Sequence, residues 1–213
     1  MEQVKQFKKY AYLALMFAPL VVSLFVVWFL PETIVSRMDI AGNVTATASR
    51  FSIFLFPILV AILGFGIRIA SSSPKLTGGN VRTARSISWI LLLLLNVIAY
   101  FQFWLYLGGM TVGAQMSRFL TFILGVFFIL IGNLAPKIKE NSKHFGFRAS
   151  WLKNNDAAFR KTQRFFGIAS VVAGILMMLT GIFMGNNVAI LVATMIMIIL
   201  IAVTGGYSYY IAN

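Results

Sequence analysis

The sequence predicts an all-α integral membrane protein, a bundle of six transmembrane helices with both termini in the cytoplasm. Hydrophobic residues make up 60% of the 213 residues and charged residues only 11%, and the mean hydropathy is +0.88. Soluble domains carry roughly 25% charged residues, because their surfaces must be hydrated. The composition therefore excludes a water-soluble monomer and a disordered chain. Long uncharged stretches separated by basic segments provide the remaining argument.

The uncharged stretches set the number of spans, since a helix needs about 20 apolar residues to cross the hydrocarbon core. The last stretch, 165–212, has forty-eight residues without a charge. One helix of that length would extend about 72 Å, so we expect it to fold back at Gly185–Asn187. The segment GGMTVGAQ at 108–115 is typical of a turn, which ends the third span near Leu107. We interpret residues 1–213 as one polytopic domain with spans at 11–30, 51–70, 87–107, 119–134, 165–184 and 188–210.

The basic residues predict the orientation of these spans. Fifteen of the 18 lysines and arginines fall on the side of the amino terminus, and the opposite side has only Arg37, Arg50 and Arg118. Cytoplasmic loops carry an excess of basic residues, so we expect an external loop at 31–50 and a basic cytoplasmic loop at 135–164. The net charge of +13 then reflects topology, and we expect no binding of nucleic acid.

The residues that carry chemistry in enzymes are scarce. The five acidic residues all fall in tails or loops of the predicted topology, and the chain has no cysteine and one histidine, His144. Proton- and ion-coupled carriers place ionisable residues inside the membrane, and metal sites need several histidine, cysteine or carboxylate ligands. We therefore expect no enzyme activity, no metal and no cofactor.

Polar and small residues inside the spans have packing interpretations. Asn96 and Gln102 lie within the third span; they either line a cavity or make interhelical hydrogen bonds, and we favour the hydrogen bonds. Ser170, Ala173 and Gly174 in the fifth span indicate close helix packing.

The basic cytoplasmic loop has the most informative composition. Between Pro136 and Arg164 it has eight basic and two acidic residues with interleaved aromatic residues. Asn154, Asn155 and Asp156 predict a helix start, with amide caps and an acid near the positive end of the helix dipole. An anchor to anionic lipid would explain the charge, at about 1 kcal/mol per basic residue, but it would not explain the order of the residues.

That order resembles the signature loop of the SdpI-type immunity family, whose pattern is roughly GN-x-x-PK-x-K-x-N, then G-[IF]-R-x-P-W, then W-x-x-THR-x-x-G. The residues that carry the resemblance are Gly132, Asn133, Pro136, Lys137, Ile138, Lys139, Asn141, Gly146, Phe147, Arg148, Trp151, Arg160, Lys161, Thr162, Arg164 and Gly167. The segment after the first span also resembles a family feature, through Leu30, Pro31, Ile34, Gly42, Ser49 and Arg50. Several positions depart from the pattern: Arg37 and Gln163 replace histidines, Val35 and Ser150 replace prolines, Thr45 replaces an aspartate and Phe159 replaces a tryptophan.

The resemblance implies a bacterial cytoplasmic-membrane protein that gives immunity to a secreted, membrane-active toxin peptide without a catalytic step. It also implies signalling through a cytoplasmic transcriptional repressor that the membrane protein recruits. The expected partners are thus the lipid bilayer, the toxin and such a repressor. The candidate residues for toxin or partner binding are Pro136, Lys137, Lys139, Asn141, Gly146, Arg148, Trp151, Thr162, Arg164, Arg37, Asp39 and Arg50. A small transporter or efflux protein without carboxylate-based ion coupling is the alternative, and a scaffold for another membrane complex is a third.

Overall fold

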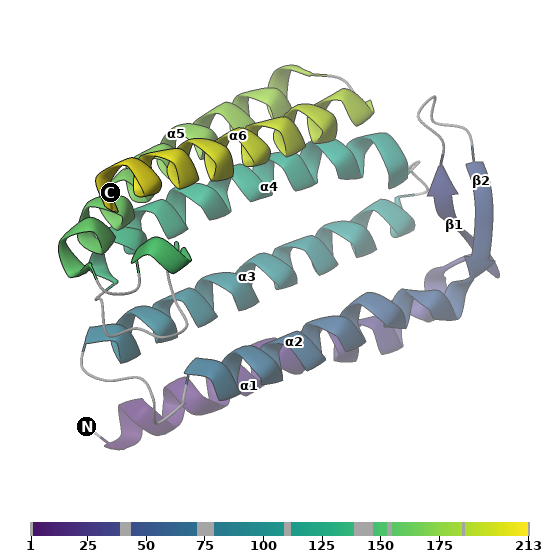
Figure 1. Ribbon diagram of the computed structural model, residues 1–213. Helices are drawn as coiled ribbons and strands as arrows, with labels where there is room; N and C mark the ends of the chain where they lie inside the picture. The colour runs from purple at the N-terminus through teal and green to yellow at the C-terminus, as the bar shows by residue number, and fades with distance from the viewer. Residues whose placement is uncertain are drawn as a thin grey trace. The chain divides into compact units, whose positions relative to one another are not determined.

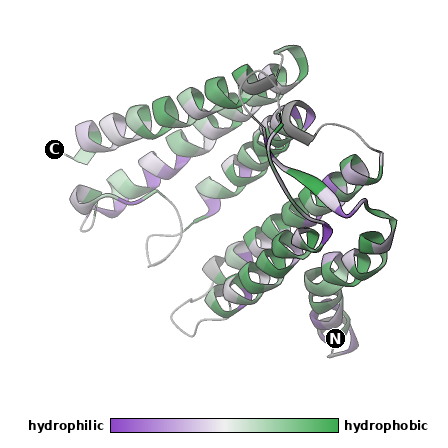
Figure 2. Cartoon of the chain, turned by 90° about the vertical axis from the view of Figure 1, so that its right-hand side faces the viewer, coloured by the Kyte–Doolittle hydropathy of each residue, from purple (hydrophilic) through white to green (hydrophobic). Residues whose placement is uncertain are grey.

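The computed structural model describes residues 2–38, 44–71, 79–108, 112–138, 147–152, 155–184 and 186–212. Within these ranges six helices are long and apolar enough to cross a membrane, which confirms the predicted number of spans. They are coloured hydrophobic over most of their lengths in Figure 2. The helices are α1 (Glu2–Val26), α2 (Leu55–Ser71), α3 (Gly79–Leu107), α4 (Val112–Leu134), α5 (Asp156–Phe183) and α6 (Asn186–Ala212).

The helix ends agree with the sequence where a break was predicted, and four of the six helices start well before their predicted spans, whereas α2 starts at Leu55, four residues after the predicted start at 51. Helix α3 ends at Leu107, and α5 gives way to α6 between Phe183 and Asn186, as expected. Helices α1, α3, α4 and α5 begin seven or more residues before their predicted spans, because a helix continues through polar residues that a count of apolar residues leaves out. The start of α5 confirms the predicted cap: the Asn155 side chain accepts a hydrogen bond from the Ala158 amide at 2.9 Å.

Contacts divide the chain into two compact units, which we describe separately. Unit 1 comprises Met1–Ala70 and Ser88–Met116, and unit 2 comprises Ser71–Ile87 and Ser117–Asn213. Most of α3 therefore belongs to unit 1, and its first turns belong to unit 2. The interpretation of residues 1–213 as a single domain stays a prediction.

Unit 1 contains a β-hairpin, which the prediction of an all-α fold with a plain loop at 31–50 missed. Strand β1 (Thr33–Met38) pairs antiparallel with β2 (Val44–Ser49), with Ile34 opposite Ala48 and irregular register on either side of Arg37. The segments TIVSRM and VTATAS are rich in β-branched residues, which favour strands. The segment is too short for a span, so its length indicated only a connection.

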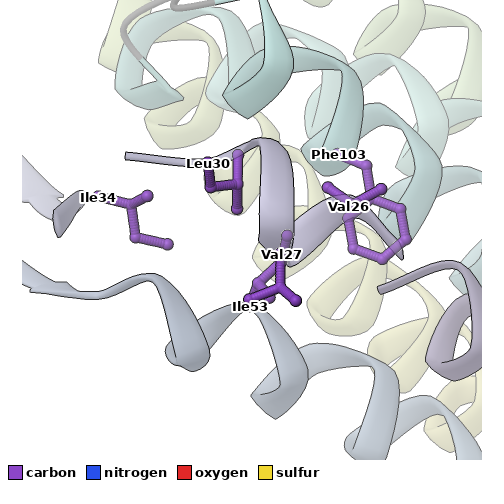
Figure 3. Packing of buried hydrophobic residues seen from close by; sticks show 6 residues of the cluster. All are labelled: Val26, Val27, Leu30, Ile34, Ile53 and Phe103. Carbon is purple, nitrogen blue, oxygen red and sulfur yellow. The ribbon is translucent and has the colours of Figure 1, made fainter. Parts of the chain in front are cut away.

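The hairpin is joined to the helices of unit 1 by a hydrophobic cluster. Val26 is the last residue of α1, and Val27 begins the 3-10 helix Val27–Phe29. Both pack with Ile34 of β1 and with Leu30, Ile53 and Phe103 (Figure 3). A second cluster lies deeper in the helices and contains Tyr12, Met16, Val60 and Leu92. The Tyr12 hydroxyl also donates a hydrogen bond to the Gly64 carbonyl at 3.0 Å.

Unit 2 contains α4, α5 and α6, with α5 and α6 packed side by side as a helical hairpin (Figure 1). Helices α4 and α5 approach closely through glycines: a Cβ atom on Gly174 would lie 2.5 Å from the Gly125 carbonyl oxygen, and one on Gly132 would lie 2.6 Å from the Gly167 carbonyl oxygen. In each helix the two glycines of this contact lie seven residues apart, so both are on one face. Ser170 and Ala173 are also buried. The small residues of the fifth span therefore mark a helix interface, as predicted.

Arg118 joins α4 to the far end of α5. Its Nη2 donates to the Ile182 carbonyl at 2.8 Å and its Nε to the Gly181 carbonyl at 3.4 Å. These carbonyls lie in the last turn of α5, where backbone acceptors lack intrahelical partners and a cation is favourable.

Candidate functional site

The motif segments come together where α4 ends and α5 begins. After α4 the chain forms a short 3-10 helix, Ala135–Lys137, in which Ala135 is fully buried. A Cβ atom on Gly167 would lie 2.7 Å from the Gly132 carbonyl oxygen and 3.0 Å from the Pro136 ring. Gly132, Pro136 and Gly167 thus form one tight contact between the two helices. This close packing explains why small residues and a proline occur at these positions of the sequence pattern.

Gln163 ties the returning loop to α5. Its side chain is 1% exposed. Its Nε2 donates to the Phe147 carbonyl at 2.8 Å, and the Phe147 amide donates to its Oε1 at 3.3 Å. One side chain therefore satisfies both backbone groups of Phe147, as a neighbouring strand would. We call this pair the Gln163 clamp.

The clamp fixes the position of the next residue, Arg148. The Arg148 guanidinium lies over the Phe159 ring at 5.5 Å from its centroid, a cation–π arrangement. Phe159 is buried and begins the second turn of α5. The Phe147 ring lies 6.0 Å from that of Phe166. Both residues of the loop segment are thus held by aromatic residues of α5.

Trp151 links the loop to the end of α6. It lies in a 3-10 turn, Ser150–Leu152, and its Nε1 donates to the Ser208 hydroxyl at 3.0 Å. The Trp151 ring meets the Tyr209 ring edge-on at 5.7 Å. The next residue in the chain, Leu152, is buried. The loop residues are therefore attached to both α5 and α6.

The other candidate residues of this loop have different environments. Thr162 is fully buried, and its hydroxyl oxygen has no hydrogen-bond partner among the described residues. Pro136, Lys137 and Arg164 are exposed. Lys139, Asn141 and Gly146 lie outside the described residues, as does His144. The exposed basic residues can meet a charged partner, whereas Thr162 supports packing.

A partly open cavity of about 470 Å³ lies in unit 2 beside these contacts. Its walls come from the first part of α3, from α4, α5 and α6, and from the loop residues on either side of the undescribed segment. Arg148 is the one charged residue among its lining residues, and the others are apolar. The volume is in the range of small-molecule sites.

The remaining candidate residues, in and next to the β-hairpin, belong to unit 1. Arg37 is exposed on β1 opposite Ala46. The Arg50 guanidinium lies 5.9 Å from the Trp28 ring centroid and 5.5 Å from that of Phe51. Asp39 lies outside the described residues. Arg50 thus has the surroundings of a membrane-interface anchor, with aromatic rings on both sides.

Two polar residues of α3 bond within their own helix, which corrects the expectation of interhelical hydrogen bonds. Asn96 Nδ2 donates to the Leu92 carbonyl at 2.9 Å. Gln102 Nε2 donates to the Tyr106 hydroxyl at 3.5 Å, and that hydroxyl donates to the Val35 carbonyl of β1 at 3.4 Å. A carbonyl four residues back is always within reach of a helical side chain, whereas an interhelical partner must be placed by packing.

Sequence reasoning missed two residues of this site. Gln163 was recognised only as a departure from the family pattern, and Ser208 was not considered. The signal for Gln163 was an uncharged amide between basic residues of an amphipathic helix. For Ser208 it was the polar and aromatic end of α6, GGYSYY.

Two known protein families match parts of the chain that contain these candidate residues. Residues 137–208 match the SdpI/YfhL protein family, which covers the basic loop, α5 and most of α6. Residues 14–61 match a domain of unknown function (DUF1648), which covers the second half of α1, the β-hairpin and the start of α2. No curated protein and no solved structure matches the chain. Residues 137–208 are thus similar to the SdpI/YfhL family, and the described helices have the number, length and apolar composition of a multi-pass membrane protein.

Proposed function

We propose that the protein gives a bacterial cell immunity to a membrane-active toxin peptide, acting in the cytoplasmic membrane without a catalytic step. The observation that carries the proposal is the family match over residues 137–208. Several of the described motif residues in this region contact α5 and α6. Gly132 with Gly167, Gln163 with Phe147, and Trp151 with Ser208 tie the described parts of this segment to one another. Residues held in place by packing and hydrogen bonds suit a binding or reporting role.

In this proposal the toxin meets the hairpin of unit 1 and the apolar helix surfaces within the bilayer. Arg37 is exposed on the hairpin, and Arg50 lies between aromatic rings that suit the membrane interface. On the cytoplasmic side Lys137, Arg148 and Arg164 are exposed. Their positive charge would steer an acidic surface of a repressor protein toward the loop.

Survival under toxin tests the proposal. Expression of the chain in a toxin-sensitive strain should restore growth, and the double variant Arg148→Gln with Arg164→Gln should abolish protection at matched membrane abundance. The matched control is Lys143→Gln with Lys153→Gln, which removes the same charge from the same loop. Failure of the wild-type chain to protect would refute the immunity proposal, and equal effects of the two doubles would refute the role of the motif arginines.

The orientation has its own test, because the chain has no native cysteine. We propose that both termini are cytoplasmic, which places Asn43 outside and Asn154 inside. An impermeant thiol reagent applied to intact cells should label Asn43→Cys and leave Asn154→Cys unlabelled. Labelling of Asn154→Cys in sealed cells would reverse the orientation and with it the assignment of the basic loop to the repressor.

A further inference from the structure

We propose that the cavity of unit 2 binds one acyl chain of an anionic phospholipid, with the lipid phosphate at Arg148. The juxtaposition that suggests this is an apolar cavity of about 470 Å³ with a single guanidinium in its wall. An acyl chain is a long apolar group that ends in a charged head group, so the cavity and the ligand have the same distribution of polarity.

The cavity reaches from the loop into the helical layer. Ile138 and Arg148 come from the loop, whereas Met197 and Ile201 come from α6. At 1.5 Å per residue, Ile201 lies about 16 Å before the end of α6 and Met197 about 22 Å before it. Phe128 lies about 9 Å before the end of α4 by the same rise. A chain that starts at Arg148 would therefore run toward the middle of the membrane, as acyl chains do.

Arg148, the charged residue in the cavity wall, is positioned by contacts of its loop segment with α5. The Gln163 clamp holds Phe147 at both backbone groups, and the Phe159 ring lies under the Arg148 guanidinium at 5.5 Å. Arginine presents five N–H donors in a planar fork that matches the oxygens of a phosphate. A guanidinium whose position is fixed loses little side-chain entropy when it binds an anion.

The cavity can be entered from the outside of unit 2, because Ile201 in its wall is 58% exposed. The basic loop adds a preference for a net negative head group, since eight basic and two acidic residues lie between Pro136 and Arg164. Such segments attract anionic lipid. A phospholipid satisfies the apolar wall, the guanidinium and the surrounding charge together.

The test uses the full chain in nanodiscs that contain phosphatidylethanolamine and a trace of phosphatidylglycerol with a photoreactive diazirine on one acyl chain. We expect crosslinks at α4 and α6 around Phe128, Met197 and Ile201. Unlabelled phosphatidylglycerol should compete for these crosslinks, and additional phosphatidylethanolamine should not. Arg148→Gln should lower the crosslink yield by about tenfold, the effect of losing one charge-assisted contact, and Arg148→Lys should lower it less.

Matched variants separate the site from general contact with lipid. Arg160→Gln removes the same charge from exposed α5, and its crosslink yield should equal that of the wild type. Ile201→Trp, which fills the entrance, should lower the yield, whereas Ile198→Trp on the same helix should not. Equal yields from Arg148→Gln and Arg160→Gln, or equal competition by the two lipids, would overturn the proposal. Stronger labelling by a photoreactive fatty acid would overturn the phospholipid as ligand. No toxin is present, so these results are independent of the immunity proposal.

Discussion

The two units achieve close helix packing in different ways. In unit 1 a glycine faces a side chain: a Cβ atom on Gly64 would lie 2.8 Å from the Met16 Cγ, and one on Gly66 would meet nothing within 4 Å. In unit 2 the glycines of α4 and α5 face backbone: a Cβ atom added to Gly125 or Gly174 would lie 2.5 Å from the carbonyl oxygen of the other glycine. A methionine side chain can move aside, whereas a helix backbone cannot.

This difference teaches where each unit tolerates change. Unit 1 is held by large apolar side chains such as Ile53, Leu92 and Phe103, which can repack after a substitution of similar volume. Unit 2 combines a backbone-to-backbone seam with loop residues 147–152, where Phe147 is hydrogen-bonded to Gln163 and Trp151 to Ser208. The candidate site lies in the unit with less freedom, as expected for a site that must keep its geometry.

The largest effect should come from a methyl group in the seam of unit 2. Gly174→Ala should lower the free energy of unfolding by about 3 kcal/mol, because α4 and α5 must separate to admit the Cβ. The measurement is unfolding by dodecyl sulfate in mixed micelles. Gly64→Ala in unit 1 should cost about 1 kcal/mol, since Met16 can adjust. Gly66→Ala should cost nothing. Equal losses at Gly174 and Gly66 would remove the distinction between the units.

The next effect concerns the Gln163 clamp. Gln163→Ala should lower the free energy of unfolding by about 2 kcal/mol, because the Phe147 amide and carbonyl both lose their partner. Hydrogen exchange should show faster exchange at residues 147–152 than in the wild type. Gln163→Glu keeps an acceptor for the Phe147 amide and loses the donor to its carbonyl, so its effect should be intermediate. Unchanged exchange in Gln163→Ala would contradict the clamp.

The hydrogen bond between loop and α6 should contribute less. Trp151→Phe keeps an aromatic ring against Tyr209 and removes the donor to Ser208, with an expected loss of about 1 kcal/mol. Ser208→Ala should cost a similar amount. In a double-mutant cycle the two losses should not add, since either change removes the same hydrogen bond. Additive losses would mean that the two residues are not coupled, and so that the hydrogen bond between them contributes nothing.

The smallest effect is expected for the polar link of unit 1. Tyr106→Phe removes the hydroxyl between Gln102 and the Val35 carbonyl, where both distances are long, at 3.5 and 3.4 Å. Hydrogen bonds between membrane segments average about 0.6 kcal/mol, and we expect less than that here. Tyr100→Phe is the control on the same helix. A loss larger than that of Trp151→Phe would show that unit 1 also depends on a polar contact.

Local rules predicted much of this protein from sequence. Apolar length predicted six spans, and Gly185–Asn187 predicted the break between α5 and α6. The amides before Asp156 predicted the start of α5, since capping depends on neighbouring residues only. The hairpin was missed because its strands are short, and a two-stranded sheet depends on packing such as that of Ile34 on Val27.

Of the candidate site, the sequence determined which segments contribute, and the tertiary structure decided what each residue does. Motif order indicated Pro136, Arg148 and Trp151, because these residue types recur in a recognisable pattern. Only the tertiary contacts show that the Pro136 ring packs against Gly167 and that the Gln163 side chain hydrogen-bonds to the Phe147 backbone. They also decided that an apolar cavity lies beside Arg148. The physical reason is range: composition, capping and span length are properties of a continuous stretch of chain. A cavity or a clamp exists only after helices far apart in the sequence have packed together.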